Sequence, residues 1–441
     1  MSRSLRPTAG AFLLAFAGLA LLLGWWTVAA PGLSARDDNP RNVFAEQRIR
    51  RGAILDRAGQ VLAESVPLSG TFSRRYPLTD TSPTVGYYSI NYGVAGLEEA
   101  FDAVLRGNAD SIDRLLHRPQ TGRSIRATID AELNAELTAR LTEPGALVVL
   151  SVPDGQVLAA TSFPAYDPNT LDADWKTLSA DPTAPLLNRV TQGLYQPGAI
   201  LQTVLLAEGL ERQAITLTQA QPQLAAPVSL ASLTLNCTHV TQPITTVVDA
   251  YADACPALFA DFGVALGEAE LISITQKWGL TEPPPLEIRT AAAPTLTLAL
   301  STTVALQAYA AGQGELTVTP LHMARVAVVI GSGGSMPAGR LVSEIEQPDG
   351  TWREANSIGV SERLIGVSTA RSVLAAMKTI DQVAGHGGAA YSGRKKLSWF
   401  IGLAPADAPR YAIAVLLEDP PANIAAPAED LGRAVLQTLL P

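Results

Sequence analysis

The stretch LNRVTQGLYQPGAILQ, residues 187–202, places a turn directly before a mostly apolar segment that continues to Glu211. Pro197 and Gly198 favour a turn, and the apolar run after them predicts a buried helix that begins near these two residues. Helical residues three apart lie on one face, so Ala199 and Gln202 share the same side of the first turn. The stretch therefore predicts a buried helix that presents these two side chains together.

Strands are predicted on both sides of this helix in the sequence. Apolar runs separated by turn residues are typical of strands in a buried sheet. The candidate strands are residues 145–150, 157–160, 397–403 and 411–418, with a turn at Asp154-Gly155. Two helices are predicted around them, one capped by Asp130 and one over residues 427–440. Residues 123–441 therefore predict one large α+β domain.

A smaller region precedes this domain, over residues 31–122. It begins with a polar linker, and residues 51–63 then predict strand, turn and strand, with Gly59 in the turn. Residues 96–107 predict an amphipathic helix that ends at Gly107. We interpret the region as a linker and a small β-rich module.

The N-terminus predicts a membrane anchor. Residues 9–30 carry no charge and are long enough to cross the hydrocarbon core of a bilayer. Arginines in the tail of residues 1–8 place that tail in the cytoplasm, and the rest of the chain outside. A cleaved signal peptide is the alternative, although its apolar region is usually shorter.

Composition excludes some classes of site. The formal net charge of −9 argues against a nucleic-acid-binding surface. Only two cysteines occur, Cys237 and Cys255, and outside the cytoplasm they form a candidate disulfide. Two free thiols, or a zinc site that also uses His239, are the alternatives, but the spacing is not that of a zinc motif. The sequence implies no metal and no cofactor.

Several stretches in order resemble the class B penicillin-binding proteins, the D,D-transpeptidases of bacterial cell-wall (peptidoglycan) synthesis. RGAILDR at residues 51–57 and GYYS at 86–89 are similar to the family's non-catalytic, or pedestal, module. GALVVL at 145–150, residues 187–195 and WFIGLAPA at 399–406 are similar to its transpeptidase domain. The resemblance implies a transmembrane anchor, the module, and a β-lactamase-like domain with an antiparallel sheet flanked by helices.

The family's chemistry needs a Ser-x-x-Lys motif at the start of a helix, where lysine takes the proton from the serine nucleophile. Here the matching segment continues as residues 196–202, so Ala199 stands at the serine and Gln202 at the lysine. A methyl group cannot form an acyl-enzyme, and a neutral amide cannot accept the proton.

The other two motifs are replaced as well. In place of Ser-x-Asn the chain has Ala254 and Pro256 around Cys255. In place of Lys-Thr-Gly it has His386, Gly387 and Gly388, so that only the glycine is retained. The resemblance therefore implies a catalytically degenerate member.

Three other places in the sequence offer a hydroxyl that could replace the missing serine. Ser392 and Lys395 match Ser-x-x-Lys, but they lie in a polar stretch that predicts a hairpin turn. Ser89 belongs to the N-terminal module, and Thr203 points into the predicted core. His386 is a candidate ligand contact that would hold a carboxylate at low pH; a histidine packed in a filled cleft is the alternative.

We therefore hypothesise a non-catalytic scaffold or regulator of peptidoglycan synthesis, acting in division or elongation. Its expected partner is a membrane glycan polymerase or an active penicillin-binding protein. One alternative is a reversible receptor for a peptidoglycan stem peptide or a β-lactam. The other is a D,D-transpeptidase with an unrecognised nucleophile.

Overall fold

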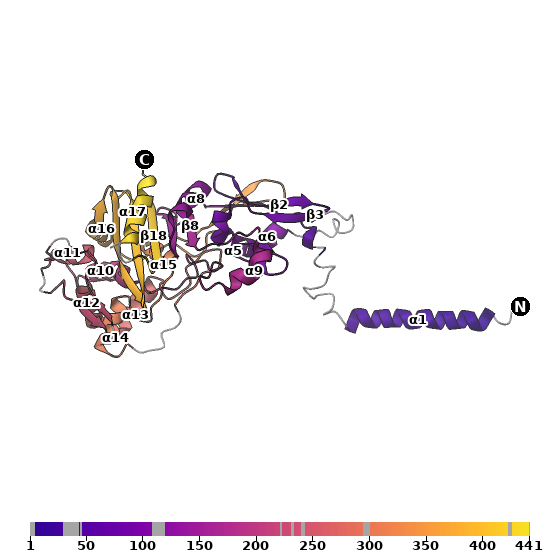
Figure 1. Ribbon diagram of the computed structural model, residues 1–441, viewed down its shortest axis with the longest axis horizontal. Coiled ribbons are helices and arrows are strands. Elements are labelled where there is room, and N and C mark those ends of the chain that lie inside the picture. Colours follow the sequence, from indigo (N-terminus) through magenta and orange to yellow (C-terminus); the bar gives the residue numbers. More distant parts are fainter. Residues whose placement is uncertain are drawn as a thin grey trace.

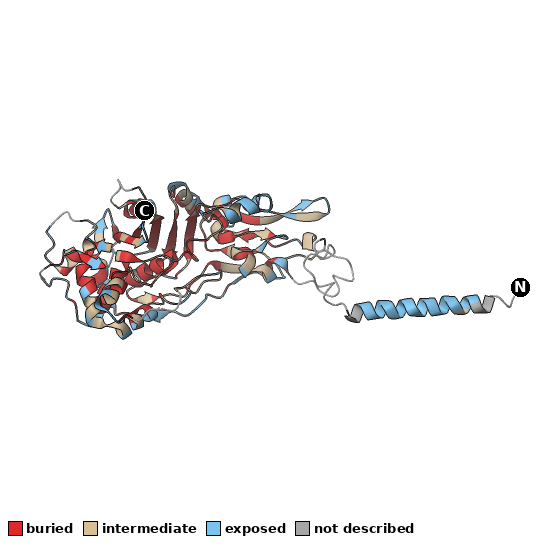
Figure 2. Cartoon of the chain, turned by 60° about the horizontal axis from the view of Figure 1, so that its bottom comes forward, coloured by how far each residue is buried: buried red, intermediate tan, exposed pale blue. Residues whose placement is uncertain are grey.

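The computed structural model describes residues 5–29, 44, 46–107, 120–220, 223–230, 233–239, 243–293, 300–421 and 426–440. Helix α1 (Leu5–Ala29) extends away from the folded body (Figure 1). Its apolar side chains, among them Phe12, Leu13 and Trp25, are exposed (Figure 2). One helix among the described residues, over Thr8–Trp26, is long and apolar enough to cross a membrane. These features are consistent with a membrane-anchored protein.

The body nearest to α1 contains a six-stranded sheet in the order β13-β12-β6-β1-β2-β3. The strands are β1 (Ile54–Leu55), β2 (Val61–Leu68), β3 (Thr71–Arg75), β6 (Ile125–Ala127), β12 (Val342–Glu346) and β13 (Trp352–Glu354). The expected boundary at residue 122 falls just before β6. Because β12 and β13 come from much later in the chain, the sheet of the module is continuous with the large domain.

A buried ion pair fixes the module's helix α5 (Gly96–Ala100) to this sheet. Arg51 and Arg74 both donate to the carboxylate of Glu98, at 2.9 and 2.6 Å, and none of the three side chains is more than 3% exposed. The single helix predicted over residues 96–107 is wrong. Phe101 leaves the helical region (φ −112°, ψ 22°), so α5 is followed by a separate helix, α6 (Asp102–Arg106).

The large domain is built on a second six-stranded sheet, in the order β15-β16-β17-β18-β7-β8, with every neighbouring pair antiparallel. Its strands are β7 (Gly145–Ser151), β8 (Val157–Phe163), β15 (Lys378–Ile380), β16 (Val383–Ser392), β17 (Lys395–Ala404) and β18 (Tyr411–Glu418). The predicted hairpin and the two predicted C-terminal strands are thereby confirmed.

Helices cover both faces of this sheet (Figure 2). On one face α8 (Ala131–Arg140) and α17 (Pro427–Thr438) pack against Leu147, Val149 and Val415. On the other face α15 (Pro320–Gly331) packs against the alternate residues of the same strands, such as Val148 and Ala414. Asp130 caps α8 as predicted, since its carboxylate accepts from the Leu133 amide at 3.2 Å. The α+β fold class is therefore confirmed.

A helical lobe lies beside the sheet, at the end of the molecule far from α1 (Figure 1). It contains the helices after β8 that line or support the predicted site. These are α10 (Gln202–Glu211), α11 (Val247–Ala252), α12 (Ala257–Leu266), α13 (Glu268–Lys277) and α14 (Thr303–Ala310).

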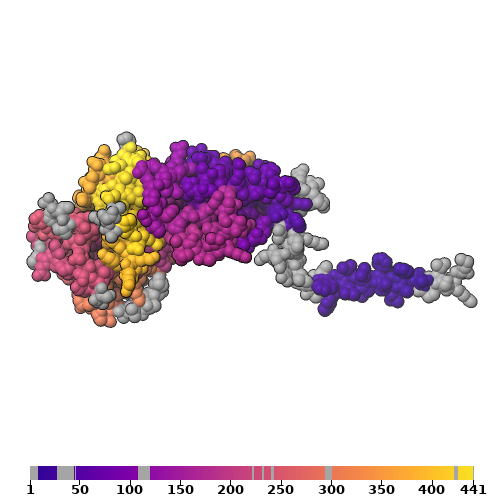
Figure 3. Space-filling model, viewed as in Figure 1, coloured from indigo at the N-terminus to yellow at the C-terminus, as the bar shows by residue number. Residues whose placement is uncertain are grey.

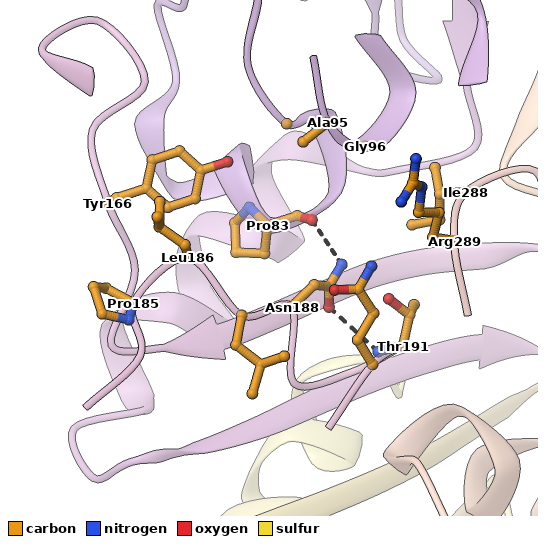
Figure 4. A pocket seen from close by; sticks show the side chains of 13 residues that line it. Pro83, Ala95, Gly96, Tyr166, Pro185, Leu186, Asn188, Thr191, Ile288 and Arg289 are labelled. Carbon is orange, nitrogen blue, oxygen red and sulfur yellow. Dashed lines mark hydrogen bonds between the residues drawn. The ribbon is translucent and has the colours of Figure 1, made fainter. Parts of the chain in front are cut away.

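The module and the large domain form one continuous body (Figure 3). Asn188 donates to the carbonyl oxygen of Pro83 in the module's helix α4 (Ser82–Val85) at 2.6 Å (Figure 4). The next residue, Arg189, donates to Glu418 of β18 at 2.7 Å. The stretch that leads to the predicted site is therefore held by the module on one side and by the sheet on the other. The hollow at this junction, about 50 Å³, is too small for more than one or two waters.

Candidate functional site

Ala199 lies where a short 3₁₀ helix, η2 (Gly198–Leu201), begins the predicted buried helix and runs directly into α10. Gly198 has a positive φ of 56°, and a Cβ there would overlap the carbonyl oxygen of Ala389 in β16. Glycine is therefore required for this close approach of helix and strand. The indole of Trp399 donates to the carbonyl oxygen of Gln196 at 2.9 Å and holds the preceding turn. The helix start is thus pressed against the sheet.

The loop that carries the second motif position lies between α11 and α12. Ala254 has a φ of 51°, which is uncommon for a residue other than glycine. Cys255 is joined to Cys237 by a disulfide, so the candidate pair is bonded and leaves no thiolate for the zinc alternative. The Gln202 side chain donates to the carbonyl oxygen of Cys255 at 3.2 Å. Gln202 therefore connects the helix to the loop.

The third motif position lies on β16, and it meets the other two. A Cβ added at Gly388 would overlap the Cβ of Ala199 and would stand 3.4 Å from the Cβ of Ala254. The Pro256 ring lines the same cavity as these alanines. The structure thus brings together three motif positions that lie far apart in the sequence, and the side chains that meet at this point are methyl groups and a proline ring.

His386 faces inward beneath this point. Its Nε2 donates to the carbonyl oxygen of Ala199 at 3.1 Å, and its ring stacks on Tyr251 with the centroids 4.1 Å apart. Burial lowers the pKa of His386 to about 4, against a smaller opposing effect of the Ala199 hydrogen bond. The side chain is neutral at pH 7 and only 2% exposed. These contacts favour the packed histidine over the ligand contact.

Gly387 faces the opposite side of β16, toward Glu429 of α17. His239 Nε2 lies 3.2 Å from one oxygen of this carboxylate, and Arg433 donates to the other at 2.8 Å. Burial would raise the pKa of Glu429, but the nearby His239 imidazole and the Arg433 guanidinium outweigh it and lower the pKa to about 2. The carboxylate is therefore engaged by its own neighbours.

A cavity of about 280 Å³ opens over Ala199, Gln202, Ala254 and Pro256. Sequence reasoning missed four polar residues that also line it: Asn236, Thr238, Tyr391 and Lys396. The disulfide partner Cys237 could have drawn attention to the first two, while Tyr391 and Lys396 lie beside the β16–β17 turn without a motif of their own. Among the described lining residues, no hydroxyl is hydrogen-bonded to an amine or an imidazole. A hydrogen bond of that kind is one way to activate a hydroxyl nucleophile, and the described lining hydroxyls do not have it.

Ser392, Lys395, Thr203 and Ser89 are not among the residues that line this cavity. Ser392 and Lys395 pair across the β16–β17 hairpin, as predicted. Thr203 is fully buried and hydrogen-bonded to the Tyr251 hydroxyl at 2.8 Å. Ser89 contacts Asp172 beside the module. His322 caps α15 with Thr319, and His117 lies outside the described residues.

Two family matches cover most of the chain. Residues 145–437 match the penicillin-binding protein transpeptidase domain, and residues 51–124 match the penicillin-binding protein A dimerisation domain. The chain is 31% identical to peptidoglycan D,D-transpeptidase PbpA of Mycolicibacterium smegmatis, over 100% of this chain and 99% of that protein. It is 28% identical to PbpA of Mycobacterium tuberculosis, over 93% of each.

Solved structures show the same likeness. Penicillin-binding protein A from M. tuberculosis, in its imipenem acyl-enzyme complex, superposes with a TM-score of 0.79 at 28% identity. The match covers 90% of this chain and 99% of that one. The D,D-transpeptidase domain of a peptidoglycan glycosyltransferase from Eggerthella lenta gives a TM-score of 0.76 at 25% identity, over 89% and 99%.

Proposed function

Since the chain belongs to the penicillin-binding protein transpeptidase family, we propose that it is a member without transpeptidase activity, which acts as a membrane-anchored scaffold or regulator of peptidoglycan synthesis. The observation that carries the proposal is the meeting of Ala199, Ala254 and Gly388 at one point. Penicillin-binding protein A from M. tuberculosis has been solved as imipenem and penicillin G acyl-enzyme complexes, so that relative forms a covalent bond with β-lactams. A methyl group at residue 199 cannot form that bond.

The electrostatics of the site support the same proposal. General-base catalysis needs a group that can accept a proton near neutral pH and that reaches the nucleophile. Gln202 has no such group. The Nε2 of His386 carries a proton, which it donates to the carbonyl oxygen of Ala199, so this nitrogen cannot accept another. Loss of a serine nucleophile alone costs about 10⁶ in rate, on the order of 8 kcal/mol of barrier.

The preserved parts of the chain support a docking role. The buried Arg51–Glu98–Arg74 network holds the module in shape, and α1 provides an apolar helix for the bilayer. The matched module is named for dimerisation. In this proposal the N-terminus is cytoplasmic, and the module contacts a membrane glycan polymerase or an active penicillin-binding protein outside.

A reconstitution experiment tests the proposal. The full chain is placed in vesicles with a glycan polymerase from the same organism, and the rate of glycan polymerisation is measured. We expect the full chain to change this rate, and a version lacking residues 1–35 to have no effect because it is not held at the membrane. An unchanged rate with each candidate partner, or an equal effect from the soluble version, would contradict the proposal.

A receptor is the second candidate, and the cavity of about 280 Å³ favours it, because the cleft is not filled by the replaced side chains. Equilibrium dialysis of a D-Ala-D-Ala stem peptide against the ectodomain tests it. Saturable binding that is lost in a Lys396→Ala variant would support a receptor function. If the ectodomain does not bind the peptide, the receptor function is excluded and the scaffold proposal stands alone.

A further inference from the structure

A second cavity of about 280 Å³ lies on a different part of the large domain and shares no lining residue with the cleft. It opens between the end of α13, the loop after it, and the middle of α15. Its apolar walls come from Trp278, Met336 and Leu364. The volume corresponds to roughly nine water-sized groups, which is the size of a small organic molecule.

Arg325 of α15 also lines this cavity. Its side chain is partly buried, and within the described part of the chain it forms no hydrogen bond and no ion pair. Burial lowers the pKa of Arg325 to about 10, with no carboxylate near enough to oppose the effect. A guanidinium prefers bidentate contact with a carboxylate or phosphate. Arg325 therefore lacks the anion that such a group usually has.

The other polar atoms of the inner wall already have partners. Lys277 and the Trp278 indole both donate to Glu208, at 2.6 and 2.8 Å. His322 Nε2 lies 2.9 Å from the Glu282 carbonyl oxygen, and its Nδ1 caps α15. These groups cannot neutralise Arg325.

Two exposed glutamates, Glu282 and Glu362, also line the cavity, and we take its mouth to be where they lie. Neither forms an ion pair with Arg325 in the described structure, so the cation inside and the anions outside remain separate. A simple anion such as phosphate would be attracted by Arg325 and repelled at the mouth. A molecule with a carboxylate at one end and an ammonium at the other would satisfy both charges.

We propose that this cavity is a binding site for a free apolar amino acid, with its carboxylate on Arg325, its ammonium toward Glu282 and Glu362, and its side chain against Trp278, Met336 and Leu364. The site is independent of the proposed scaffold role and of the cleft. It would let the protein respond to a small extracellular amino acid without any catalytic step.

Isothermal titration calorimetry of the full chain in detergent micelles tests this site with four matched probes. Leucine carries both charges, 4-methylpentanoate lacks the ammonium, 3-methylbutylamine lacks the carboxylate, and inorganic phosphate is a plain anion. We expect saturable binding of leucine, weaker binding of 4-methylpentanoate, and no binding of the amine or of phosphate. Binding of phosphate but not leucine would overturn the assignment, as would no binding of any free amino acid.

Single substitutions test whether Arg325 and Glu362 contribute to the binding of leucine. Arg325→Gln should weaken leucine binding by about tenfold or more, because a charge-assisted bidentate contact is lost. Arg353→Gln, on exposed β13, is the matched control and should bind as the natural chain does. Glu362→Gln changes an exposed side chain, so the protein should remain folded, and it should weaken leucine but not 4-methylpentanoate. Unchanged leucine binding in either Arg325→Gln or Glu362→Gln would contradict the proposal.

Discussion

A Gly388→Ala substitution tests whether the three motif positions truly meet. A Cβ at residue 388 would overlap the Cβ of Ala199 and would stand in ordinary contact with that of Ala254 at 3.4 Å. The Ala199 Cβ is attached to the backbone, so it cannot rotate away. Overpacking of this kind costs about 1–3 kcal/mol of the free energy of unfolding. We therefore expect the urea concentration at the midpoint of unfolding of the ectodomain to fall, by this free energy divided by the m-value.

A double-mutant cycle assigns the effect to the predicted contact. Ala199→Gly removes the overlapping methyl group, so Gly388→Ala should cost at least about 1 kcal/mol less in that background. Gly387→Ala is the control on the same strand, because its Cβ would meet Glu429 at 3.1 Å and the carbonyl oxygen of Trp399 at 3.2 Å, both less close than the overlap at Gly388. It should cost less than Gly388→Ala. Additive effects of Ala199→Gly and Gly388→Ala would refute the convergence of the two motifs.

Three further predictions concern stability. Glu98→Gln leaves the buried Arg74 guanidinium without a carboxylate and leaves Arg51 with Asp102 alone, so it should lower the free energy of unfolding by about 3–5 kcal/mol in urea titrations, whereas Glu64→Gln at the half-exposed pair with Arg75 should change little. Replacing both Cys237 and Cys255 with serine opens a loop with a sequence separation of 18 and should cost roughly 3 kcal/mol; an unchanged thermal midpoint would contradict this. The folded-state pKa of His386 is about 4, below the usual 6.5, so the unfolded chain binds the proton first as pH falls. The contribution of neutral His386 to the free energy of unfolding is therefore fully present above about pH 6.5. As the pH falls toward 4, the free energy of unfolding decreases by up to about 3 kcal/mol. The substitution His386→Gln should make the free energy of unfolding less dependent on pH in this range.

The sequence predicted four of the six strands of the large sheet, β7, β8, β17 and β18, and the helices α8 and α17 that cover one face, because their apolar pattern is strong. It did not predict β15, β16 or α15. The hairpin of β7 and β8 and the cap at Asp130 follow from local residue chemistry alone. The strands β12 and β13 of the module's sheet were not predictable in this way, because they return to it from more than 200 residues beyond β6. Pairing at that distance leaves no local signal in a single sequence.

The candidate site was predictable only in part. The positions of Ala199, Ala254 and Gly388 followed from motif flanks, and the structure brings them together. The polar rim of Thr238 and Lys396 depends on how a loop and a hairpin fold over the helix, which no spacing encodes. The unpaired charge of Arg325 was equally hidden, because an arginine on a helix is usually solvated, and only tertiary packing leaves it without an anion.

Covalent labelling with a fluorescent penicillin tests the central claim most directly. The ectodomain, residues 36–441, is incubated with the reagent beside the related PbpA of M. smegmatis as the positive control, and both are denatured before detection. We predict a labelled band for the control and none for this chain, because residue 199 offers a methyl group where an acyl bond would form. A stoichiometric label that survives denaturation and maps to a single residue would contradict the account.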